Sequence, residues 1–270
     1  MVRGVRKRFG QHFLEPAWVD KVIRAIDPKA DELFIEIGPG RGALTRPLVE
    51  RAKAVMAFEI DRGLAAELSA TAPPNLTVTQ GDFLERADVR FPTSDSVRVA
   101  GNLPYNVASR ILFKLVELYA LGVPLVDATV MLQREVADRL IAPPGGKEYG
   151  VLSILIRHAA HVEMVMKLPP GAFRPPPAVN SALVRLRFHA PDPPVQDSAA
   201  FAGLVQAVFT RRRKTLANAL LAYEGTAAAS SPAEMLAAAD LDRSRRPETL
   251  SIAEFARLAD AYSGKRRAVL

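Results

Sequence analysis

The feature that most limits the fold of this chain is the alternation, between residues 33 and 132, of short apolar runs with longer amphipathic stretches. Short runs rich in β-branched and aromatic residues predict strands, and apolar residues at every third or fourth position predict helices. Strands separated by helices pair in parallel through right-handed crossovers, so we expect an α/β fold with a doubly wound sheet. The predicted strands span residues 33–38, 54–60, 76–81, 97–101 and 127–133, and the predicted helices span residues 43–52, 62–71 and 107–122.

The sequence pattern changes twice after residue 160. Two strand-like runs, 161–168 and 181–189, flank a proline-rich segment, and we expect them to add a hairpin-like antiparallel pair near the C-terminal edge of the mostly parallel sheet. The segment APDPPVQDS at 190–198 neither packs nor continues a helix, which makes it a linker. Apolar residues recur at helical spacing beyond it. We therefore predict a domain of residues 1–190 and a small all-helical domain of residues 191–270.

The composition excludes several classes of protein. The 270 residues include no cysteine, which rules out disulfides, thiolate metal sites and a cysteine nucleophile, and the four histidines are scattered, so we expect no metal centre. No apolar run approaches the roughly 18 residues of a membrane span, and the first ten residues lack the apolar centre of a signal peptide. We therefore expect a globular, cytoplasmic protein, with a monomer as the default state.

Positive charge is concentrated at the two ends of the chain. Residues 1–8 hold four basic and no acidic side chains, and residues 187–270 hold 12 basic against 9 acidic ones, whereas residues 9–186 have 20 of each. The densest cluster consists of Arg211, Arg212, Arg213 and Lys214. Such clusters are commonly solvated faces, but two of them in a chain of pI near 9.9 favour a polyanionic partner.

The segment EIGPGRGA at 36–43 lies where the first predicted strand gives way to a helix. Gly38, Gly40 and Ala43 match the loose G-x-G-x-x-[G/A] nucleotide-binding pattern, in which an acidic ribose ligand such as Glu59 follows about 20 residues later. Three interpretations compete. They are a nicotinamide or flavin dehydrogenase, an S-adenosylmethionine enzyme, and a structural turn.

The charge around this loop favours S-adenosylmethionine. A pyrophosphate binds best at a helix N-terminus without a nearby carboxylate, whereas Glu36 directly precedes the glycines. S-adenosylmethionine has no phosphate, and acidic strand ends attract its sulfonium and ammonium groups. Glu59 can accept hydrogen bonds from both ribose hydroxyls, and Asp82 can accept one from the adenine amino group, with Phe83 beside the ring. Each carboxylate alone could be a helix cap, but all three stand at strand ends along one edge of the predicted sheet.

The turn GNLPYN at 101–106 follows a strand-like run and contains no acid, strong base or nucleophile. Such a turn suits holding a flat polar ring better than attacking it. The lone pair of an exocyclic base amine is delocalised into the ring, so hydrogen bonds that strengthen as the nitrogen becomes pyramidal assist its methylation. No strong base is needed, because the methylated ammonium product is acidic and loses its proton to nearby groups or water.

Each residue of the turn has a predicted role. The Asn102 side-chain oxygen and the Leu103 carbonyl can accept the two amine protons. Pro104 fixes the backbone that aims these acceptors, and Tyr105 can stack on the base. The alternative is an ordinary strand-end turn with a partly buried tyrosine.

Nine segments resemble, in the same order, those of the KsgA-type ribosomal RNA adenine dimethyltransferases. They are QHFL at 11, EIGPGRG at 36, FEID at 58, GDF at 81, GNLPYN at 101, QREVADRL at 133, YGVLS at 149, FRPPPAVNSALV at 173 and FTRRRKTLANAL at 209. The resemblance spans nearly the whole chain, although NVASR at 106 departs mildly from the family's usual sequence. It implies a Rossmann-like methyltransferase fold that uses S-adenosylmethionine. It also implies addition of two methyl groups to N6 of each of two adjacent adenosines in a hairpin near the 3′ end of small-subunit rRNA.

The resemblance also implies roles by position. Gln11, His12 and Leu14 would close over the methyl donor, and only the family pattern gives His12 such a role. Phe173 would cover the second face of the target base, and its alternative is a hydrophobic plug in a stiff loop. The predicted donor-binding residues are thus Gln11, His12, Leu14, Glu36, Gly38, Gly40, Glu59, Ile60, Asp82, Phe83 and Asn102, and the predicted target-binding residues are Asn102, Leu103, Pro104, Tyr105 and Phe173.

The implied partner is small-subunit rRNA within an assembling 30S particle. A base in a stem must be extruded before its amine can reach the donor, and the flanking RNA must be held. We expect the helical domain and the N-terminal arm to hold it, through Arg6, Lys7, Arg8, Arg211, Arg212, Arg213 and Lys214.

Two alternatives remain open. An Erm-type large-subunit rRNA adenine methyltransferase shares the pocket, but the leucine in NLPY, the segment FRPPPAVNS and the form of the C-terminal region favour the small-subunit type. A ribosome-assembly RNA-binding factor could keep the fold without the chemistry, but the complete set of pocket residues argues against lost activity.

Overall fold

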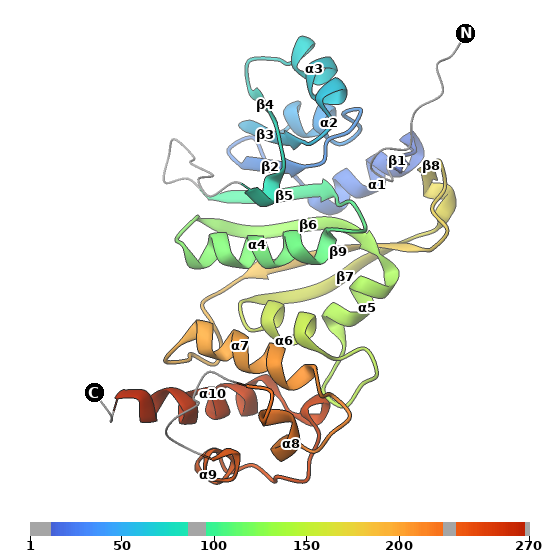
Figure 1. Ribbon diagram of the computed structural model, residues 1–270. Coiled ribbons are helices and arrows are strands. Elements are labelled where there is room, and N and C mark those ends of the chain that lie inside the picture. Colours follow the sequence, from blue (N-terminus) through green and yellow to red (C-terminus); the bar gives the residue numbers. More distant parts are fainter. Residues whose placement is uncertain (1–11, 86–95, 224–230, 268–270) are drawn as a thin grey trace. The chain divides into compact units, whose positions relative to one another are not determined.

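The computed structural model describes residues 12–85, 96–223 and 231–267 (Figure 1). The chain divides into two compact units. Unit 1 consists of Met1–Ala137 and Val162–Phe188, and unit 2 consists of Asp138–His161 and His189–Leu270. Within the described part of the chain, no helix has the length and hydropathy needed to span a bilayer.

Unit 1 is built around a seven-stranded sheet with the strand order β4-β3-β2-β5-β6-β9-β7. Neighbouring strands from β4 to β6 pair in parallel, and β9 runs antiparallel to β6. The strands are β2 (Leu33–Ile37), β3 (Ala54–Glu59), β4 (Leu76–Gln80), β5 (Val97–Asn102), β6 (Leu125–Gln133), β7 (Ala160–Leu168) and β9 (Ser181–Phe188). The predicted fold class, a mostly parallel doubly wound sheet with an antiparallel strand near one edge, is confirmed.

The centre of this sheet determines where a ligand can bind. All five residues of β2 are buried, and β2 has β3 on one side and β5 on the other. Ligands of doubly wound sheets bind at such a reversal of strand order, beyond the carboxyl ends of the strands. The two central strands approach closely there, because a Cβ atom added to Gly101 would lie 2.4 Å from the Ile37 carbonyl oxygen. Only glycine fits at this position, which accounts for the first residue of GNLPYN.

The three helices predicted between the strands are present as α2 (Thr45–Val49), α3 (Arg62–Ala70) and α4 (Ala108–Ala120). The short α2 has Pro47 in its first turn, where the missing backbone N–H costs no helical hydrogen bond. The start of α3 is capped by Asp61, whose Oδ1 accepts from the backbone N–H groups of the next turn. A single 3₁₀ turn, η1 (Phe83–Glu85), follows β4.

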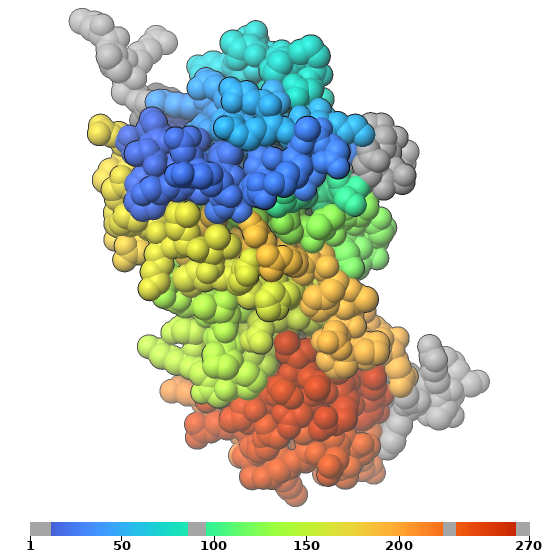
Figure 2. All heavy atoms as spheres, turned by 180° about the vertical axis from the view of Figure 1, so that it is seen from behind, coloured from blue at the N-terminus to red at the C-terminus, as the bar shows by residue number. Residues whose placement is uncertain are grey.

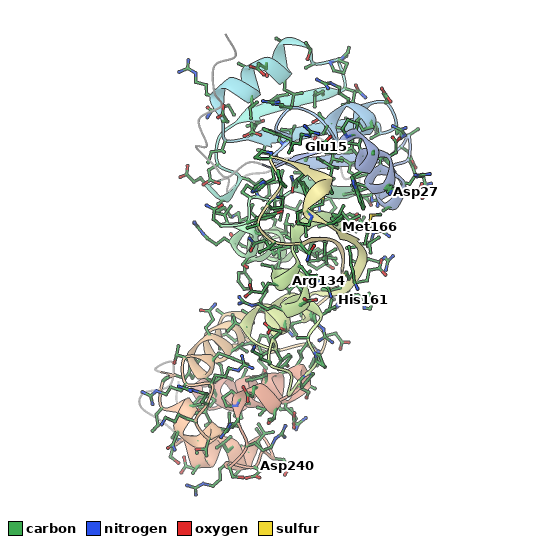
Figure 3. All side chains as sticks on the ribbon, turned by 90° about the vertical axis from the view of Figure 1, so that its right-hand side faces the viewer. Glu15, Asp27, Arg134, His161, Met166 and Asp240 are labelled. Carbon is green, nitrogen blue, oxygen red and sulfur yellow. The ribbon has the colours of Figure 1, made fainter. Side chains whose placement is uncertain are left out.

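The sequence analysis did not predict α1 (Pro16–Ile26), which begins with proline at its first position. Its apolar face packs on the sheet, where Ile26 and Phe34 belong to one core cluster. Figure 2 shows the dark-blue N-terminal part of the chain, which includes α1, spread over this face of unit 1. Glu15 precedes the helix and Asp27 ends it in a left-handed conformation (Figure 3).

The strand β1 (Phe13–Leu14) lies just before α1. It pairs with β8 (Phe173–Arg174) in the antiparallel sense and forms a separate two-stranded sheet. The contact continues into the helix start, because the backbone N–H of Glu15 donates to the Ala172 carbonyl at 2.9 Å, at the end of the 3₁₀ turn η2 (Pro170–Ala172). The proline-rich segment therefore holds the N-terminal strand in place.

A buried ion-pair network fixes the C-terminal end of α1. The Arg98 guanidinium binds both carboxylate oxygens of Asp127 at 2.8 Å and Glu32 at 2.8 Å, and it also donates to the Ile26 carbonyl. Arg98 and Asp127 are 9% and 6% exposed, so neither charge could be left unpaired without a large desolvation penalty.

Unit 2 is helical, as the sequence predicts for the end of the chain. Its helices are α6 (Val151–Arg157), α7 (Ser198–Phe209), α8 (Leu216–Leu220), α9 (Pro232–Ala238) and α10 (Ile252–Arg267), with a 3₁₀ turn η3 (Pro247–Thr249), while α5 (Arg134–Ile141) spans the division between the units. Buried Phe201 of α7 and Phe255 of α10 lie in one core. The α9 start carries a capping box of Ser231 and Glu234.

The division of the chain differs from the predicted one over one long stretch. Asp138–His161 belongs to unit 2, because buried Tyr149 and Ile154 pack into its core and the Tyr149 hydroxyl donates to the Leu250 carbonyl at 2.8 Å. The segment 190–198, predicted as a linker at the start of the second domain, lies in unit 2, where the Pro193 carbonyl binds His158 Nε2 at 2.7 Å.

Candidate active site

A cavity of about 160 Å³ lies beyond the carboxyl ends of β2, β3 and β5 in unit 1. It brings together most of the residues that the sequence analysis assigned to donor and target binding. These are His12, Leu14, Glu36, Gly38, Gly40, Glu59, Ile60, Asp82, Phe83, Asn102, Leu103, Pro104 and Tyr105. Gln11 lies outside the described residues, as do Arg6, Lys7 and Arg8.

The sequence analysis missed several residues of the lining. Phe13, Ile37, Pro39, Leu44, Phe58, Gly81, Asn106, Val107, Ile111 and Met131 also face the cavity, together with Ala43 of the glycine pattern. Most of them belong to the motifs already quoted, so a reading of whole motifs would have found them. Ile111 from α4 and Met131 from β6 carry no local signal, since each looks like any other apolar core residue of its element.

The glycine turn after β2 forms a cradle for the ligand. Gly38 and Gly40 have φ values of 71° and 57°, a left-handed conformation that residues with a Cβ atom rarely adopt. The N–H of Gly38 donates to the Phe58 carbonyl at 2.9 Å, and that of Gly40 donates to Glu59 Oε2 at 2.9 Å. A Cβ atom on Gly40 would also approach the Phe13 ring to 3.1 Å. The turn is therefore bound to β3 and leaves its open side to the cavity.

Glu36 is the most unusual residue of the cavity. It is 1% exposed, and its Oε2 atom has no hydrogen-bond partner among the described residues, nor does the buried Thr45 hydroxyl. Burial raises the pKa of Glu36 to about 8; the Thr45 side chain opposes the rise and the carboxylate of Glu59 adds to it. A buried carboxylate oxygen without a partner is a strong reason to expect a cationic or hydrogen-bond-donating ligand.

Glu59 and Asp82 are held by backbone groups. Each oxygen of Glu59 accepts one backbone N–H at 2.9 Å, from Gly40 and from Asp61, and Asp82 Oδ1 accepts from Leu84 at 2.9 Å. A carboxylate offers about four acceptor sites, so both residues keep free lone pairs for a ligand. They are fixed in orientation before any ligand arrives, as a row of nucleoside-binding acceptors requires.

The Asn102 side chain has a defined orientation. Its Nδ2 donates to the His12 carbonyl at 2.7 Å, which leaves Oδ1 as an acceptor pointing away from that contact. The turn itself is fixed by two backbone bonds, from Leu103 N–H to the Met131 carbonyl and from Val107 N–H to the Pro104 carbonyl. The acceptors that the sequence analysis assigns to a neutral clamp thus lie on a backbone that is hydrogen-bonded to β6.

Tyr105 is held by residues that the sequence analysis did not connect with it. The Tyr105 and Ser181 hydroxyls are 2.6 Å apart, and the His12 ring stacks on the Tyr105 ring with 5.6 Å between centroids and 24° between planes. His12 Nδ1 in turn donates to the Pro175 carbonyl at 2.6 Å. Burial raises the pKa of Tyr105, so the phenol remains neutral.

Phe173 does not line the cavity. It is 1% exposed and belongs to the hydrophobic core of unit 1, with Leu14 as its partner in the β1–β8 pair. The Phe173 ring is therefore a core side chain in this structure, as the plug alternative predicts. It does not lie over a target base, as the family resemblance implied.

The basic cluster at 211–214 follows α7 in unit 2. Arg211, Arg213 and Lys214 are exposed, but Arg212 is half-buried. Arg212 Nε binds Glu248 at 2.5 Å and its NH2 group donates to the Gly146 carbonyl, so this side chain is engaged inside unit 2. The exposed three are the ones able to contact a polyanion.

The cavity fits a cationic nucleoside with an amino-acid arm. Buried Glu36 supplies an unpartnered acceptor for a cation, the glycine turn leaves room for a close approach, and Glu59 and Asp82 offer acceptors at the next two strand ends. Phe83 contacts Phe58 edge to face at 5.4 Å and adds an apolar wall beside Asp82. Together with the doubly wound sheet, these features define a Rossmann-like methyltransferase that takes an S-adenosylmethionine-type donor.

Comparison with known proteins specifies the family. The model of the ribosomal RNA adenine dimethylase family matches residues 2–258, and the chain belongs to this family. The chain is 38% identical to the ribosomal RNA small subunit methyltransferase A of Laribacter hongkongensis, over 97% of each chain. It is 42% identical to the protein of that name from Leptothrix cholodnii, over 95% of this chain and 91% of the relative. The protein is thus an rRNA adenine dimethyltransferase.

Two solved structures have the same fold as this chain. A dimethyladenosine transferase from Plasmodium falciparum superimposes with a TM-score of 0.78 at 25% identity, covering 94% of this chain and 98% of that chain. The 23S rRNA methyltransferase ErmE superimposes with a TM-score of 0.63 at 25% identity, covering 93% and 99%. The chain therefore shares its fold with a dimethyladenosine transferase and with a 23S rRNA methyltransferase.

Proposed function

We propose that this protein transfers methyl groups from S-adenosylmethionine to N6 of two adjacent adenosines in the 3′-terminal hairpin of small-subunit rRNA. The product is N6,N6-dimethyladenosine, formed during assembly of the 30S particle. The observation that carries the proposal is the neutral Asn102 turn at one end of a cavity whose other end holds three acidic strand ends. The names of the relatives, which are small-subunit enzymes, support it over an Erm-type large-subunit activity.

The acidic strand ends hold the donor. When bound, S-adenosylmethionine supplies an electrophilic methyl group on a positively charged sulfur. Glu36 accepts from the ammonium group of its amino-acid arm, Glu59 accepts from the ribose hydroxyls, and Asp82 accepts from the adenine amine. Ile60, which is 41% exposed at the end of β3, offers an apolar surface for the adenine ring. These contacts orient the donor along the edge of the sheet.

The turn after β5 holds the target amine. In the first transfer Asn102 Oδ1 and the Leu103 carbonyl accept its two protons, and in the second transfer the one remaining N–H donates to one of these acceptors. These hydrogen bonds strengthen as the nitrogen lone pair leaves conjugation with the ring. Tyr105 offers a ring on which the base stacks. As the N–CH3 bond forms, the S–CH3 bond of the donor would break and S-adenosylhomocysteine would leave. Neither acceptor removes a proton during transfer, because the methylated ammonium product is acidic and loses its proton to water afterwards. Catalysis is thus achieved by orientation and by dipoles that are fixed before the reaction.

The exposed basic residues bind the RNA that flanks the extruded base. Arg211, Arg213 and Lys214, which are exposed, neutralise phosphates of that RNA. We expect a variant with all three changed to glutamate to bind small-subunit rRNA more weakly and with a flatter salt dependence, by up to about three counterions. Its affinity for the donor stays unchanged. A Lys29→Glu variant in unit 1 is the matched control, and full RNA affinity in the triple variant would remove this cluster from the proposal.

Labelled S-adenosylmethionine tests the proposed function directly. The protein is incubated with undermethylated small subunits, with protein-free large-subunit rRNA, or with neither. We expect label only in the first reaction, located by mass spectrometry in two adjacent dimethyladenosines. Label in large-subunit RNA would support the Erm-type alternative instead. Tight binding of small subunits without transfer would leave only an assembly-factor role.

A further inference from the structure

Tyr105 is constrained at its edge and on one face. Its hydroxyl contacts the Ser181 hydroxyl at 2.6 Å, and Ser181 is fully buried at the first position of β9, opposite Gln133 of β6. One ring face is covered by His12 at a stacking distance of 5.6 Å. A tyrosine on a turn has two rotatable side-chain bonds, so these two contacts remove freedom that target binding would otherwise have to remove.

His12 is itself fixed on two sides. Its Nδ1 donates to the Pro175 carbonyl at 2.6 Å, and its own carbonyl accepts from Asn102 Nδ2 at 2.7 Å. The imidazole therefore cannot slide along the tyrosine ring without breaking a hydrogen bond. Because Asn102 is also the predicted acceptor for the target amine, the position of the His12 backbone and the position of the acceptor are coupled.

Both supports of Tyr105 depend on one stretch of chain. The segment 173–181 pairs with β1 next to His12, provides the Pro175 carbonyl, and ends in Ser181. The Glu15 and Arg174 side chains form an ion pair at the same junction. A single segment thus sets the edge and the covered face of the ring, although it lies more than 65 residues after Tyr105 in the sequence.

We propose that Ser181 and His12 are positioning residues that hold the Tyr105 ring, so that its uncovered face receives the target adenine beside Asn102 Oδ1. This inference rests on the proposed function, since it concerns the base that is methylated. Ser181 acts through the tyrosine hydroxyl and His12 through the ring face, and neither contacts the reacting nitrogen. The target base then forms the third layer of a stack that is already two rings deep.

A double-mutant cycle between Tyr105 and Ser181 tests the edge contact. Tyr105→Phe and Ser181→Ala each remove one partner of the hydroxyl pair, and we expect each to lower single-turnover methyl transfer to small subunits by about three- to tenfold, the range for one hydrogen bond. The double variant should be no slower than the slower single variant. Ser181→Thr, which keeps the hydroxyl, should restore the rate.

The readouts separate positioning from a general structural effect. Donor affinity, measured by calorimetry without RNA, should remain within about twofold of wild type in the Tyr105 and Ser181 variants, because the hydroxyl groups that they remove are not among the groups assigned to the donor. If Ser181→Ala does not fold, Ser181→Cys takes its place in the cycle. A Tyr119→Phe variant is the control, since that ring stacks on Phe188 and does not line the cavity.

The stacking contact is tested with two His12 variants. His12→Phe keeps a flat ring on Tyr105 and should retain more transfer activity than His12→Ala at saturating donor. Additive losses in the Tyr105 and Ser181 cycle, a parallel loss of donor affinity in the variants of that cycle, or equal activity of the two His12 variants would overturn the inference. If wild-type protein methylates no RNA, the proposed function fails instead, so the two failures are distinguishable.

Discussion

Replacement of Glu36 by glutamine is predicted to change the pH dependence of stability. The pKa of Glu36 is raised from its ordinary value of 4.5 to about 8 by burial, so the folded protein binds more protons than the unfolded chain between these values. The stability of the wild type therefore falls as the pH rises through this window. Each pH unit costs about 1.4 kcal/mol, so we expect a loss of roughly 3 kcal/mol between pH 5 and pH 7 that Glu36→Gln does not show.

Urea denaturation at several pH values measures this difference. Both proteins share all other titrating groups, so the difference between their free energies of unfolding isolates Glu36. Any fixed penalty of the new amide displaces one curve but does not change the slope. Glu50→Gln, at an exposed surface carboxylate, is the control and should follow the wild type. Parallel curves for wild type and Glu36→Gln would refute the reasoning that burial raises the pKa of the Glu36 carboxyl.

Two further predictions concern the sheet. Gly101→Ala would place a methyl carbon 2.4 Å from the Ile37 carbonyl oxygen, and we expect a loss of about 3 kcal/mol of stability in urea denaturation; an unchanged midpoint would contradict the close approach of β2 and β5. Asp127→Asn leaves the Arg98 charge with only Glu32 as its ionic partner, and we expect a loss of about 3 kcal/mol, whereas the double variant Arg98→Met with Asp127→Leu should lose less. A double variant that is as unstable as the single one would contradict this account.

The sequence predicted the sheet and the row of acidic strand ends for the same physical reason. Strand and helix periods differ, so the alternation of elements is visible locally, and parallel strands place their carboxyl ends on one edge. Glu36, Glu59 and Asp82 could therefore be placed together before the structure was known. The Asn102 turn followed from its position after the fourth of these strands.

Contacts between distant segments left no such local signal. Ser181 and Tyr105 are 76 residues apart, and nothing in either neighbourhood indicates that their hydroxyls meet. The burial of Phe173 depends on its pairing with β1, a strand of only two residues. Arg212 looks like its three basic neighbours in sequence, and only the position of Glu248 shows that it is engaged within unit 2.

The boundary between the two units could not be predicted from the sequence for a related reason. Proline-rich composition at 190–198 suggested a linker, but composition does not reveal which core a segment joins. Buried Tyr149 and Ile154 have the same apolar character whether they pack on the sheet or on the helices. The side of the boundary on which they fall depends on tertiary contacts alone.

The rate of a single methyl transfer by Asn102→Ala, at saturating S-adenosylmethionine and with undermethylated small subunits, tests the central claim most directly. If Asn102 Oδ1 holds the amine as it becomes pyramidal, the rate should fall by about 10²- to 10³-fold, the usual cost of removing one fixed transition-state hydrogen bond. Saturating donor removes any effect of the lost contact with the His12 carbonyl on donor affinity. A rate within about threefold of wild type would show that the turn after β5 does not activate the adenine nitrogen.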